Sequence, residues 1–269
     1  MTIFALLMAV IGIMDSGSGG LSVFREIRRA LPRSRYIYFS DNAWCPYGDK
    51  TADFIRQRSS VITRELLAKG ADAIVIACNT ATAAAIASLR ETFPIPFIGM
   101  EPAVKPAALG TRSGVVGVLA TAGTLSASKY LITKGLYGSG VRIVEHTGSG
   151  FVELVENGVL DGPEAEKICA ASLLPLLEAG ADTIVLGCTH YPFLLGTLQK
   201  VAAAQGYPDI RFIDPAPAVA RRLVTVLQET GIPAEDEHPG TELLSSGPDK
   251  TLKALYALIN KEDTAPSDA

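Results

Sequence analysis

The sequence has few charged residues, few aromatic residues and only four cysteines. Charged residues make up 19% of its 269 positions, aromatic residues make up 7%, and the formal net charge is −4. Proteins that bind nucleic acids normally carry a basic excess or a basic stripe, so this balance argues against a nucleic-acid partner. Hydrophobic residues make up 48%, which is ample for a buried core and excludes a disordered chain. The length predicts one to two domains.

The cysteines and the N-terminus argue against two further classes of protein. The four cysteines, Cys45, Cys78, Cys169 and Cys188, contain no Cys-x-x-Cys pair. This argues against a zinc ribbon or a disulfide scaffold and favours reduced thiols in a cytoplasmic protein. The uncharged residues 1–14 lack the basic region and the cleavage site of a signal peptide, and they are too few to span a bilayer. We expect no membrane contact and a short N-terminal extension, with Met8 as an alternative start, before a first buried strand.

Short apolar segments rich in Val and Ile alternate along the chain with longer amphipathic segments. Helical periodicity is clear over residues 51–69 and 163–179. Apolar strands that alternate with helices are typical of parallel sheets covered on both faces. The strands that we expect span residues 10–14, 36–39, 73–77, 96–100, 115–119, 141–144, 183–187 and 211–213.

Three segments recur in the same order about 105–110 residues further along the chain. A repeat of this length indicates a duplicated α/β domain rather than a solenoid, whose periods are about 20–50 residues. We predict an α/β fold class, with two pseudosymmetric open parallel-sheet α/β domains and the active site in the cleft between them. The first domain would comprise residues 1–104 plus 214–269, and the second residues 105–213. The paired segments are 10–16 with 115–121, 69–80 with 179–190, and 100–104 with 214–219.

The repeat makes Cys78 and Cys188 equivalent. Each follows an expected strand and precedes an expected helix, and ligands of open α/β sheets bind at these carboxyl ends of the strands. The N–H groups at a helix N-terminus lower the pKa of a thiol from about 8.5 and also suit a carboxylate ligand. Asp15, at the end of the first strand, is placed to exchange a proton with Cys78, and His190 is placed to do so with Cys188. We therefore expect two poised thiols that face each other across a ligand.

Four groups of residues resemble the motifs of the glutamate racemase family, within the cofactor-independent aspartate/glutamate racemase superfamily. The likeness runs from about Ala9 to Ser246, with the motifs in the family's order and spacing. Each motif alone is a weak signal, and the four together are highly specific. They are Asp15-Ser16-Gly17 with Gly19-Gly20-Leu21, Pro46-Tyr47-Gly48, Cys78-Asn79-Thr80-Ala81, and Gly187-Cys188-Thr189-His190-Tyr191-Pro192.

The resemblance implies interconversion of L- and D-glutamate, which supplies D-glutamate for bacterial peptidoglycan. It implies glutamate as the small-molecule partner, with no cofactor and no metal, and it leaves a homodimer open. It assigns Cys78 as the thiolate base toward D-glutamate and Cys188 as the acid on the opposite face, with the roles exchanged in the other direction. Asp15 would assist Cys78, and His190 would assist Cys188. The implied substrate contacts are Asp15, Ser16, Tyr47, Gly48, Asn79, Thr80, Thr189 and His190, with Thr121 as a weaker candidate.

One segment departs from the family's pattern. Residues 146–156 lack the Cys-Pro stretch that often precedes the family's Leu-Val-Glu segment. This puts in question the assisting role that the family sometimes gives to the glutamate of that segment, Glu156 here. The other two cysteines, Cys45 and Cys169, have no counterpart in the repeat, and we expect structural or incidental roles for them.

The chemistry of racemisation agrees with a pair of thiols. A proton must leave one face of Cα and another must arrive on the opposite face, which two bases achieve without movement of a single base around the substrate. The Cα proton is very weakly acidic, so N–H and hydroxyl donors that stabilise the developing negative charge should carry much of the catalysis. The two thiols must hold opposite protonation states, and they titrate as a coupled pair.

Three alternatives remain open. An aspartate racemase of the same superfamily is the first, although those enzymes carry a glutamate after the second Cys-Thr, where this chain has His190. A non-catalytic amino-acid-binding protein of two α/β lobes is the second, but it gives no reason for paired thiols. A thiol-dependent redox or decarboxylating enzyme is the third, and a decarboxylase of the superfamily needs only one of the two cysteines.

Overall fold

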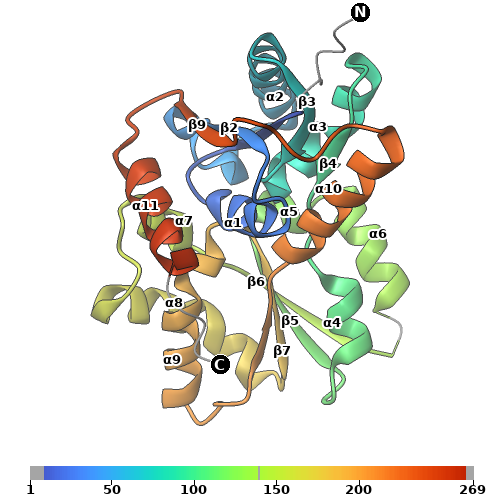
Figure 1. Cartoon of the computed structure of the whole chain (residues 1–269). Coiled ribbons are helices and arrows are strands. Elements are labelled where there is room, and N and C mark those ends of the chain that lie inside the picture. The colour runs from blue at the N-terminus through green and yellow to red at the C-terminus, as the bar shows by residue number, and fades with distance from the viewer. Residues whose placement is uncertain (1–8, 139, 265–269) are drawn as a thin grey trace, which may run out of the picture.

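The chain folds around two β-sheets, in the upper and lower halves of Figure 1. The computed structural model describes residues 9–138 and 140–264. The expected N-terminal extension and the alternative start at Met8 lie outside these described residues. None of the helices in the described ranges is long and apolar enough to cross a membrane.

The first sheet has the strand order β4-β3-β1-β2-β9, and all its pairs are parallel. Strand β9 was not among the expected strands. It pairs only with β2, and none of its residues is fully buried, so it lacks the apolar run that marks the inner strands. The strands are β1 (Val10–Asp15), β2 (Arg35–Ser40), β3 (Ala71–Ile76), β4 (Phe97–Gly99) and β9 (Gly240–Ser245).

The second sheet repeats the topology of the first. Its order is β6-β5-β7-β8, again with parallel pairs only, so that β5, β6, β7 and β8 match β1, β2, β3 and β4. Its strands are β5 (Val115–Ala120), β6 (Arg142–Thr147), β7 (Thr183–Gly187) and β8 (Arg211–Ile213). This confirms the predicted fold class, and all eight expected strands form within three residues of their expected ends. The domain boundaries at residues 104 and 213 stay a prediction.

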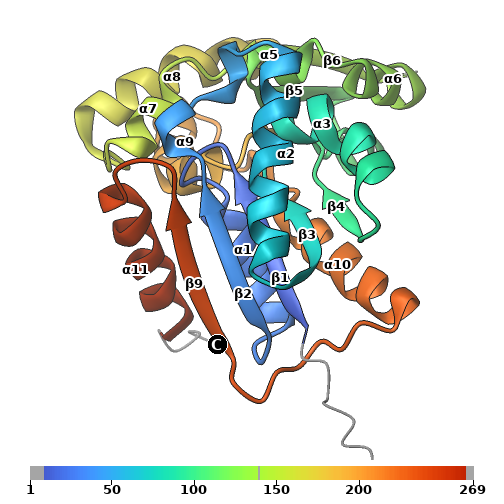
Figure 2. The same ribbon diagram turned by 90° about the horizontal axis from the view of Figure 1, so that it is seen from above.

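Helices cover both faces of each sheet. Figure 2 shows α1 and α2 on opposite faces of the first sheet. The second sheet packs against α8 and α9 on one face and against α4 and α6 on the other. The helices are α1 (Leu21–Ala30), α2 (Ala52–Ala68), α3 (Asn79–Thr92), α4 (Val104–Gly110), α5 (Ala122–Leu125), α6 (Ser128–Tyr137), α7 (Phe151–Glu156), α8 (Gly162–Glu178), α9 (Leu195–Ala204), α10 (Ala216–Thr230) and α11 (Lys250–Thr264).

The alternation of side chains along β1 explains why both of its faces are apolar. Ile11 and Ile13 pack toward α1 and α10, whereas Val10 and Met14 pack toward α2 and α3. Successive side chains of a strand point to opposite faces, so a strand covered on both sides must be apolar throughout. The cluster that contains Ile11 and Ile13 continues to Leu119 of β5, and it therefore joins the cores of the two sheets.

A glycine stands at the same place in β1 and β5, where a helix crosses close to the strand. A β-carbon on Gly117 would lie 2.6 Å from Ile184 Cδ1 and 3.0 Å from Leu176 Cδ1. The equivalent atom on Gly12 would lie 3.1 Å from Ile74 and 3.2 Å from Leu66. All four distances are shorter than ordinary van der Waals contacts, so each strand needs a residue without a side chain here.

We expect Gly117→Ala to destabilise the protein by roughly 1–3 kcal/mol, because Ile184 and Leu176 must move to admit the methyl group. Gly135→Ala is the matched control. Gly135 lies inside α6 with nothing within 4 Å of an added β-carbon, so alanine should stabilise the helix by about 0.5–1 kcal/mol. Urea unfolding of both variants measures the difference. Equal stability of the two variants would contradict this account of the strand–helix contact.

Candidate active site

A small cavity lies where the carboxyl ends of the two sheets meet. The four inner strands β1, β3, β5 and β7 each deliver the residues that line it. Ser16, Cys78, Thr121 and Cys188 follow these strands within two residues. The further lining residues are Pro46, Tyr47, Gly48, Asn79, Thr80, Val152, Gly187, Thr189 and His190. The structure thus brings all the candidate site residues except Asp15 to one cavity.

Cys78 is the N-cap residue of α3, as the repeat predicts. Its Sγ accepts a hydrogen bond from the backbone N–H of Ala81 at 3.3 Å and lies 3.6 Å from Ser16 Oγ. The side chain is buried, and only 5% of the residue is exposed. Asp15 does not line the cavity itself. It is fully buried beside Ser16, and its Oδ2 accepts a hydrogen bond from the backbone N–H of Gly20 at 2.7 Å.

Burial reverses the expected direction of the pKa shift at Cys78. Desolvation, and then repulsion from the carboxylate of Asp15, raise the pKa of Cys78 to about 12, although the N–H of Ala81 and the hydroxyl of Ser16 act in the other direction. The expectation of a thiol pKa lowered by the helix is therefore wrong for Cys78, because the loss of water destabilises the thiolate more than one helix terminus stabilises it. Burial also raises the pKa of Asp15 to about 6.

Cys188 has different surroundings. It ends β7, but a short 3-10 turn, Tyr191–Leu194, follows it before α9 begins at Leu195. The expected helix N-terminus at this thiol is thus displaced along the chain. The partner of Cys188 is instead His190, whose Nδ1 lies 3.7 Å from Sγ. The sequence predicted this pairing from the two-residue spacing.

The other ring nitrogen of His190 contacts Glu156, a residue whose role the sequence left in question. The distance from Nε2 to Glu156 Oε1 is 2.7 Å. Burial lowers the pKa of His190, but hydrogen bonds to Cys188, Cys45 and Glu156 outweigh it and raise the pKa well above its ordinary value. Burial likewise raises the pKa of Glu156, and the hydrogen bonds from His190 and Ser18 outweigh it and lower this pKa. The pair therefore exists as a buried imidazolium and a carboxylate.

Glu156 also ties the two halves of the molecule together. It is the last residue of α7, and it accepts hydrogen bonds from the backbone N–H of Ser18 at 2.6 Å and from the Ser18 hydroxyl at 3.1 Å. Ser18 belongs to the loop after β1, in the other half. Nearby, the hydroxyl of Ser22 donates to the carbonyl of Thr189 at 2.8 Å. These bonds fix the loop after β1 against α7, and the start of α1 against the loop that carries Cys188 and His190.

Polar groups without charge line the opposite side of the cavity. Thr80 Oγ1 lies 2.9 Å from Thr121 Oγ1 and 3.3 Å from Thr124 Oγ1, which joins the start of α3 to the start of α5. The amide oxygen and nitrogen of Asn79 are buried, and they have no hydrogen-bond partner among the described residues. Buried polar atoms are nearly always paired, so this amide is available to a ligand.

Tyr47 lines the cavity with its hydroxyl turned away. That hydroxyl donates to Asp41 Oδ2, and Arg58 binds the same carboxylate with Nε at 2.9 Å and Nη2 at 2.6 Å. The Asp41–Arg58 pair therefore fixes the loop of Tyr47 and Gly48. A β-carbon on Gly48 would lie 3.2 Å from the β-carbon of Thr121, so glycine lets this loop approach the second sheet.

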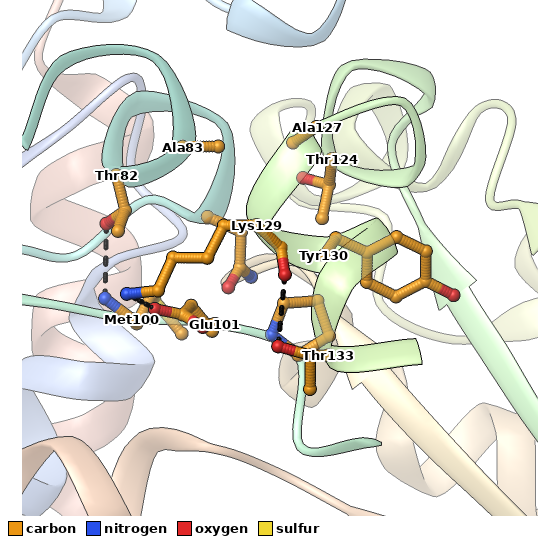
Figure 3. A pocket seen from close by; sticks show the side chains of 11 residues that line it. Thr82, Ala83, Met100, Glu101, Thr124, Ala127, Lys129, Tyr130 and Thr133 are labelled. Atoms are coloured by element: carbon orange, nitrogen blue, oxygen red, sulfur yellow. Dashed lines mark hydrogen bonds and ion pairs between the residues drawn. The ribbon is translucent and has the colours of Figure 1, made fainter. Parts of the chain in front are cut away.

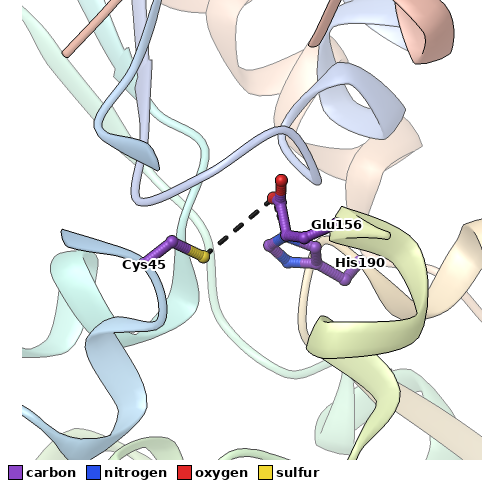
Figure 4. A group of neighbouring side chains, drawn as sticks. All are labelled: Cys45, Glu156 and His190. Carbon is purple, nitrogen blue, oxygen red and sulfur yellow. Dashed lines mark hydrogen bonds and ion pairs between the residues drawn. The ribbon is translucent and has the colours of Figure 1, made fainter. Parts of the chain in front are cut away.

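Cys45 was expected to have a structural or incidental role, and the structure places it next to Glu156. Its sulfur lies 4.0 Å from Glu156 Oε1, on the side of Glu156 that faces the loop before Pro46 (Figure 4). One ligand atom each from Cys45, Glu156 and His190 lie within 4.8 Å of one another. The signal that could have found Cys45 is its position directly before the Pro46-Tyr47-Gly48 motif. Cys169, by contrast, is fully buried in α8, as a structural role predicts.

Two other cavities adjoin the first. One shares Pro46, Gly48, Thr121 and Val152 with it and forms an outer vestibule. The other lies beyond Asn79 between α3 and α6 and is lined by Met100, Tyr130 and the Glu101–Lys129 ion pair (Figure 3). This last cavity contains no thiol among its lining residues, so the chemistry belongs to the cavity between the sheets.

Comparisons with known proteins agree with this geometry. The model of the family described as Asp/Glu/Hydantoin racemase matches residues 11–223. The glutamate racemase of Ectopseudomonas mendocina (strain ymp) is 47% identical over 253 residues, which cover 93% of this chain and 94% of that protein. The crystal structure of Escherichia coli glutamate racemase, in complex with L-glutamate and the activator UDP-MurNAc-ala, has a TM-score of 0.83 at 33% identity and covers 94% of this chain and 95% of its own.

A glutamate racemase structure with bound D-glutamate and an aspartate racemase structure also match. The glutamate racemase of Francisella tularensis subsp. tularensis SCHU S4, in complex with D-glutamate, has a TM-score of 0.79 at 26% identity and covers 95% of each chain. The aspartate racemase of Picrophilus torridus is more distant, with a TM-score of 0.52, 19% identity, and coverage of 82% of this chain and 94% of its own. This last likeness shows the fold alone.

We expect Glu156→Gln to lower the pKa of His190 and to destabilise the protein by roughly 1.5–3 kcal/mol, the range for a hydrogen bond to a charged group. A raised pKa of His190 stabilises the folded state fully below the unfolded value of about 6.5, and this contribution is lost as the pH rises through the raised value. The stability difference between wild type and variant should therefore narrow at high pH. Proton NMR titration of His190 and urea unfolding at several pH values measure both effects.

Glu153→Gln is the control, because Glu153 is an exposed residue of the same helix. It should leave the pKa of His190 nearly unchanged. If Glu156→Gln also leaves it unchanged, the ion pair does not hold the proton on His190.

Proposed function

The chain belongs to the Asp/Glu/Hydantoin racemase family, and from this premise we propose that it is a glutamate racemase. It interconverts L- and D-glutamate by proton transfer at Cα, as an isomerase without a cofactor. One observation carries the proposal: two cysteines at equivalent ends of β3 and β7 line a single cavity between the two sheets. This is the arrangement that proton exchange on two faces of one carbon requires.

The mechanism uses one thiol on each side of the substrate. Toward D-glutamate, Cys78 takes the Cα proton and Cys188 delivers a proton to the opposite face. Toward L-glutamate, Cys188 is the base and Cys78 the acid. General acid–base catalysis of this kind contributes about 10²–10⁴-fold to a rate.

Cys78 becomes a base only when the cavity is occupied. With a pKa of about 12, it is a thiol at neutral pH before the substrate binds. The ammonium group of a bound amino acid brings a positive charge close to the sulfur and favours the thiolate. Asp15, whose pKa is about 6, is the neighbouring group that takes up the proton as the thiolate forms.

On the other side, the proton is held ready by His190. The hydrogen bonds that its ring donates to Cys188 and Glu156 keep the imidazole protonated. His190 therefore supplies a proton to Cys188 when Cys188 acts as the acid, and it takes the proton back when Cys188 acts as the base. Glu156 is the positioning residue that holds the ring in the orientation with Nδ1 toward the sulfur.

Uncharged donors bind the substrate and stabilise the carbanion. The unpaired amide of Asn79 and the hydroxyls of Ser16, Thr80 and Thr121 line the cavity, and the loop residues Gly48 and Thr189 close it. Such donors act where negative charge develops at Cα and on the substrate carboxylate. The loss of one comparable donor costs roughly 2.7–4 kcal/mol of transition-state stabilisation in other enzymes.

Glutamate is favoured over aspartate as the substrate. His190 follows Cys188-Thr189, where the aspartate enzymes carry a glutamate, and the Pro46-Tyr47-Gly48 loop is of the glutamate type. The curated relative at 47% identity is a glutamate racemase, whereas the aspartate racemase structure matches at 19% identity.

The cellular role follows from the product. D-Glutamate made by this reaction would enter peptidoglycan synthesis and so serve cell-wall formation and cell shape. The proposed chemistry needs reduced thiols, and all four cysteines are free, which fits the cytoplasm. The homodimer stays a prediction.

A racemisation assay without added cofactor, followed by circular dichroism, tests the proposal. The substrates are L-glutamate, D-glutamate, L-aspartate and D-aspartate. We expect turnover of glutamate in both directions and little turnover of aspartate. Cys78→Ala and Cys188→Ala should each lower the rate by about 10²–10⁴-fold. Cys169→Ser, which removes a cysteine far from the cavity, should keep the wild-type rate. Full activity of both Cys78→Ala and Cys188→Ala would contradict the two-thiol mechanism.

A further inference from the structure

We propose that Cys45, Glu156 and His190 form a binding site for Zn²⁺, and that Zn²⁺ bound there inhibits the enzyme. The three residues are named the inhibitory trio below. The binding part of this inference stands on the geometry alone, and the inhibition rests on the proposed racemase function.

One ligand atom from each member of the inhibitory trio lies within 4.8 Å of the other two. All three atoms also lie beside Gly17. A β-carbon on that residue would be 2.4 Å from Glu156 Oε1, 2.7 Å from Cys45 Sγ and 3.2 Å from His190 Nε2, so a side chain at position 17 would collide with them. Figure 4 shows Cys45 approaching from one side and Glu156 with His190 from the other.

The distances within the inhibitory trio are close to those of a zinc site. Ligands of a tetrahedral zinc ion, at bond lengths of about 2.0–2.3 Å, lie roughly 3.3–3.6 Å from one another. Here Cys45 Sγ and Glu156 Oε1 are 4.0 Å apart, and Glu156 Oε1 and His190 Nε2 are 2.7 Å apart. The first pair must therefore close by roughly 0.4–0.7 Å and the second must open by roughly 0.6–0.9 Å, which side-chain rotations supply.

The donor set selects Zn²⁺ over hard cations. A thiolate, an imidazole nitrogen and a carboxylate oxygen are the three ligand types that zinc takes, whereas Mg²⁺ and Ca²⁺ take oxygen ligands only. Three protein ligands leave a fourth position for water. Ser18, whose N–H and hydroxyl bind the two carboxylate oxygens of Glu156, already orients one ligand from behind, as the outer partners of metal ligands do.

Zn²⁺ can reach the site from solvent, and its binding releases two protons from the ligand side chains. Cys45 is half-buried, and 20% of the Glu156 side chain is exposed, although His190 itself is buried. Binding of Zn²⁺ replaces the proton on the Cys45 thiol and the proton that His190 Nε2 shares with Glu156, and both protons pass to the solvent.

Occupancy of the site stops the reaction through His190. With Nε2 bound to the metal and its proton lost, the imidazole no longer carries the positive charge that stands beside Cys188. The metal also joins Cys45, which directly precedes the Pro46-Tyr47-Gly48 motif, to Glu156 of α7. The role is thus inhibition, distinct from the metal-free catalysis.

The test measures binding and inhibition separately, on the full-length enzyme. Titration with Co²⁺, a spectroscopic substitute for Zn²⁺, should produce the near-ultraviolet band of a thiolate bound to cobalt. Cys45→Ala should lose the band, and Cys188→Ala should keep it. In turnover assays, Zn²⁺ should inhibit the wild type reversibly, with full recovery on addition of EDTA.

Cys45→Ala should keep most of the rate that the enzyme shows without Zn²⁺. It should need at least about 10-fold more Zn²⁺ than the wild type for half-inhibition. The control variant, Cys169→Ala, should behave as the wild type. Equal inhibition of Cys45→Ala and wild type would overturn the inference and place the metal on Cys78 or Cys188. Absence of the Cys45-dependent cobalt band from an active racemase would also overturn it. A Cys45-dependent band in a protein without racemase activity would support the site while the proposed function fails.

Discussion

The site depends on one constraint of parallel sheets: all the strands of such a sheet end at the same edge. In this molecule two edges face each other. The first sheet contributes Ser16 and Cys78 to the cavity between them, and the second contributes Thr121 and Cys188. Duplication of one α/β unit therefore places two sulfur atoms at equivalent positions around one small volume. The hydroxyl contact between Thr80 and Thr121 and the bonds of Ser18 to Glu156 then hold the two edges together.

The two halves share a sulfur atom and differ in what surrounds it. Cys78 has a carboxylate, Asp15, in a fully buried position, and both groups have raised pKa values because water is excluded. Cys188 has an imidazole that a second carboxylate keeps protonated. One thiol is thus paired with a group that accepts a proton and the other with a group that donates one. Such separation of environments is how one site assigns an acid and a base to two similar groups.

The sequence predicts those parts of the site that are local in the chain. The repeat identifies Cys78 and Cys188, and the two-residue spacing predicts the contact of Cys188 with His190. It does not predict Glu156, because that contact arises when α7 packs against the loop after β1. The high pKa of Cys78 was also missed, since a helix start is visible in a sequence and the loss of water around it is not. Strand β9 escaped because an edge strand needs no continuous apolar run.

The central claim is that the two thiols act on opposite faces of one carbon, and hydrogen exchange from D₂O tests it most directly. D-Glutamate and L-glutamate are each incubated with the enzyme in D₂O, and the Cα deuterium content of substrate and product is measured during the first few percent of conversion. Two bases predict that the product carries deuterium from the solvent while the recovered substrate stays protonated. Product that keeps the original Cα proton would instead show that a single base carries it from face to face, and the account would be wrong.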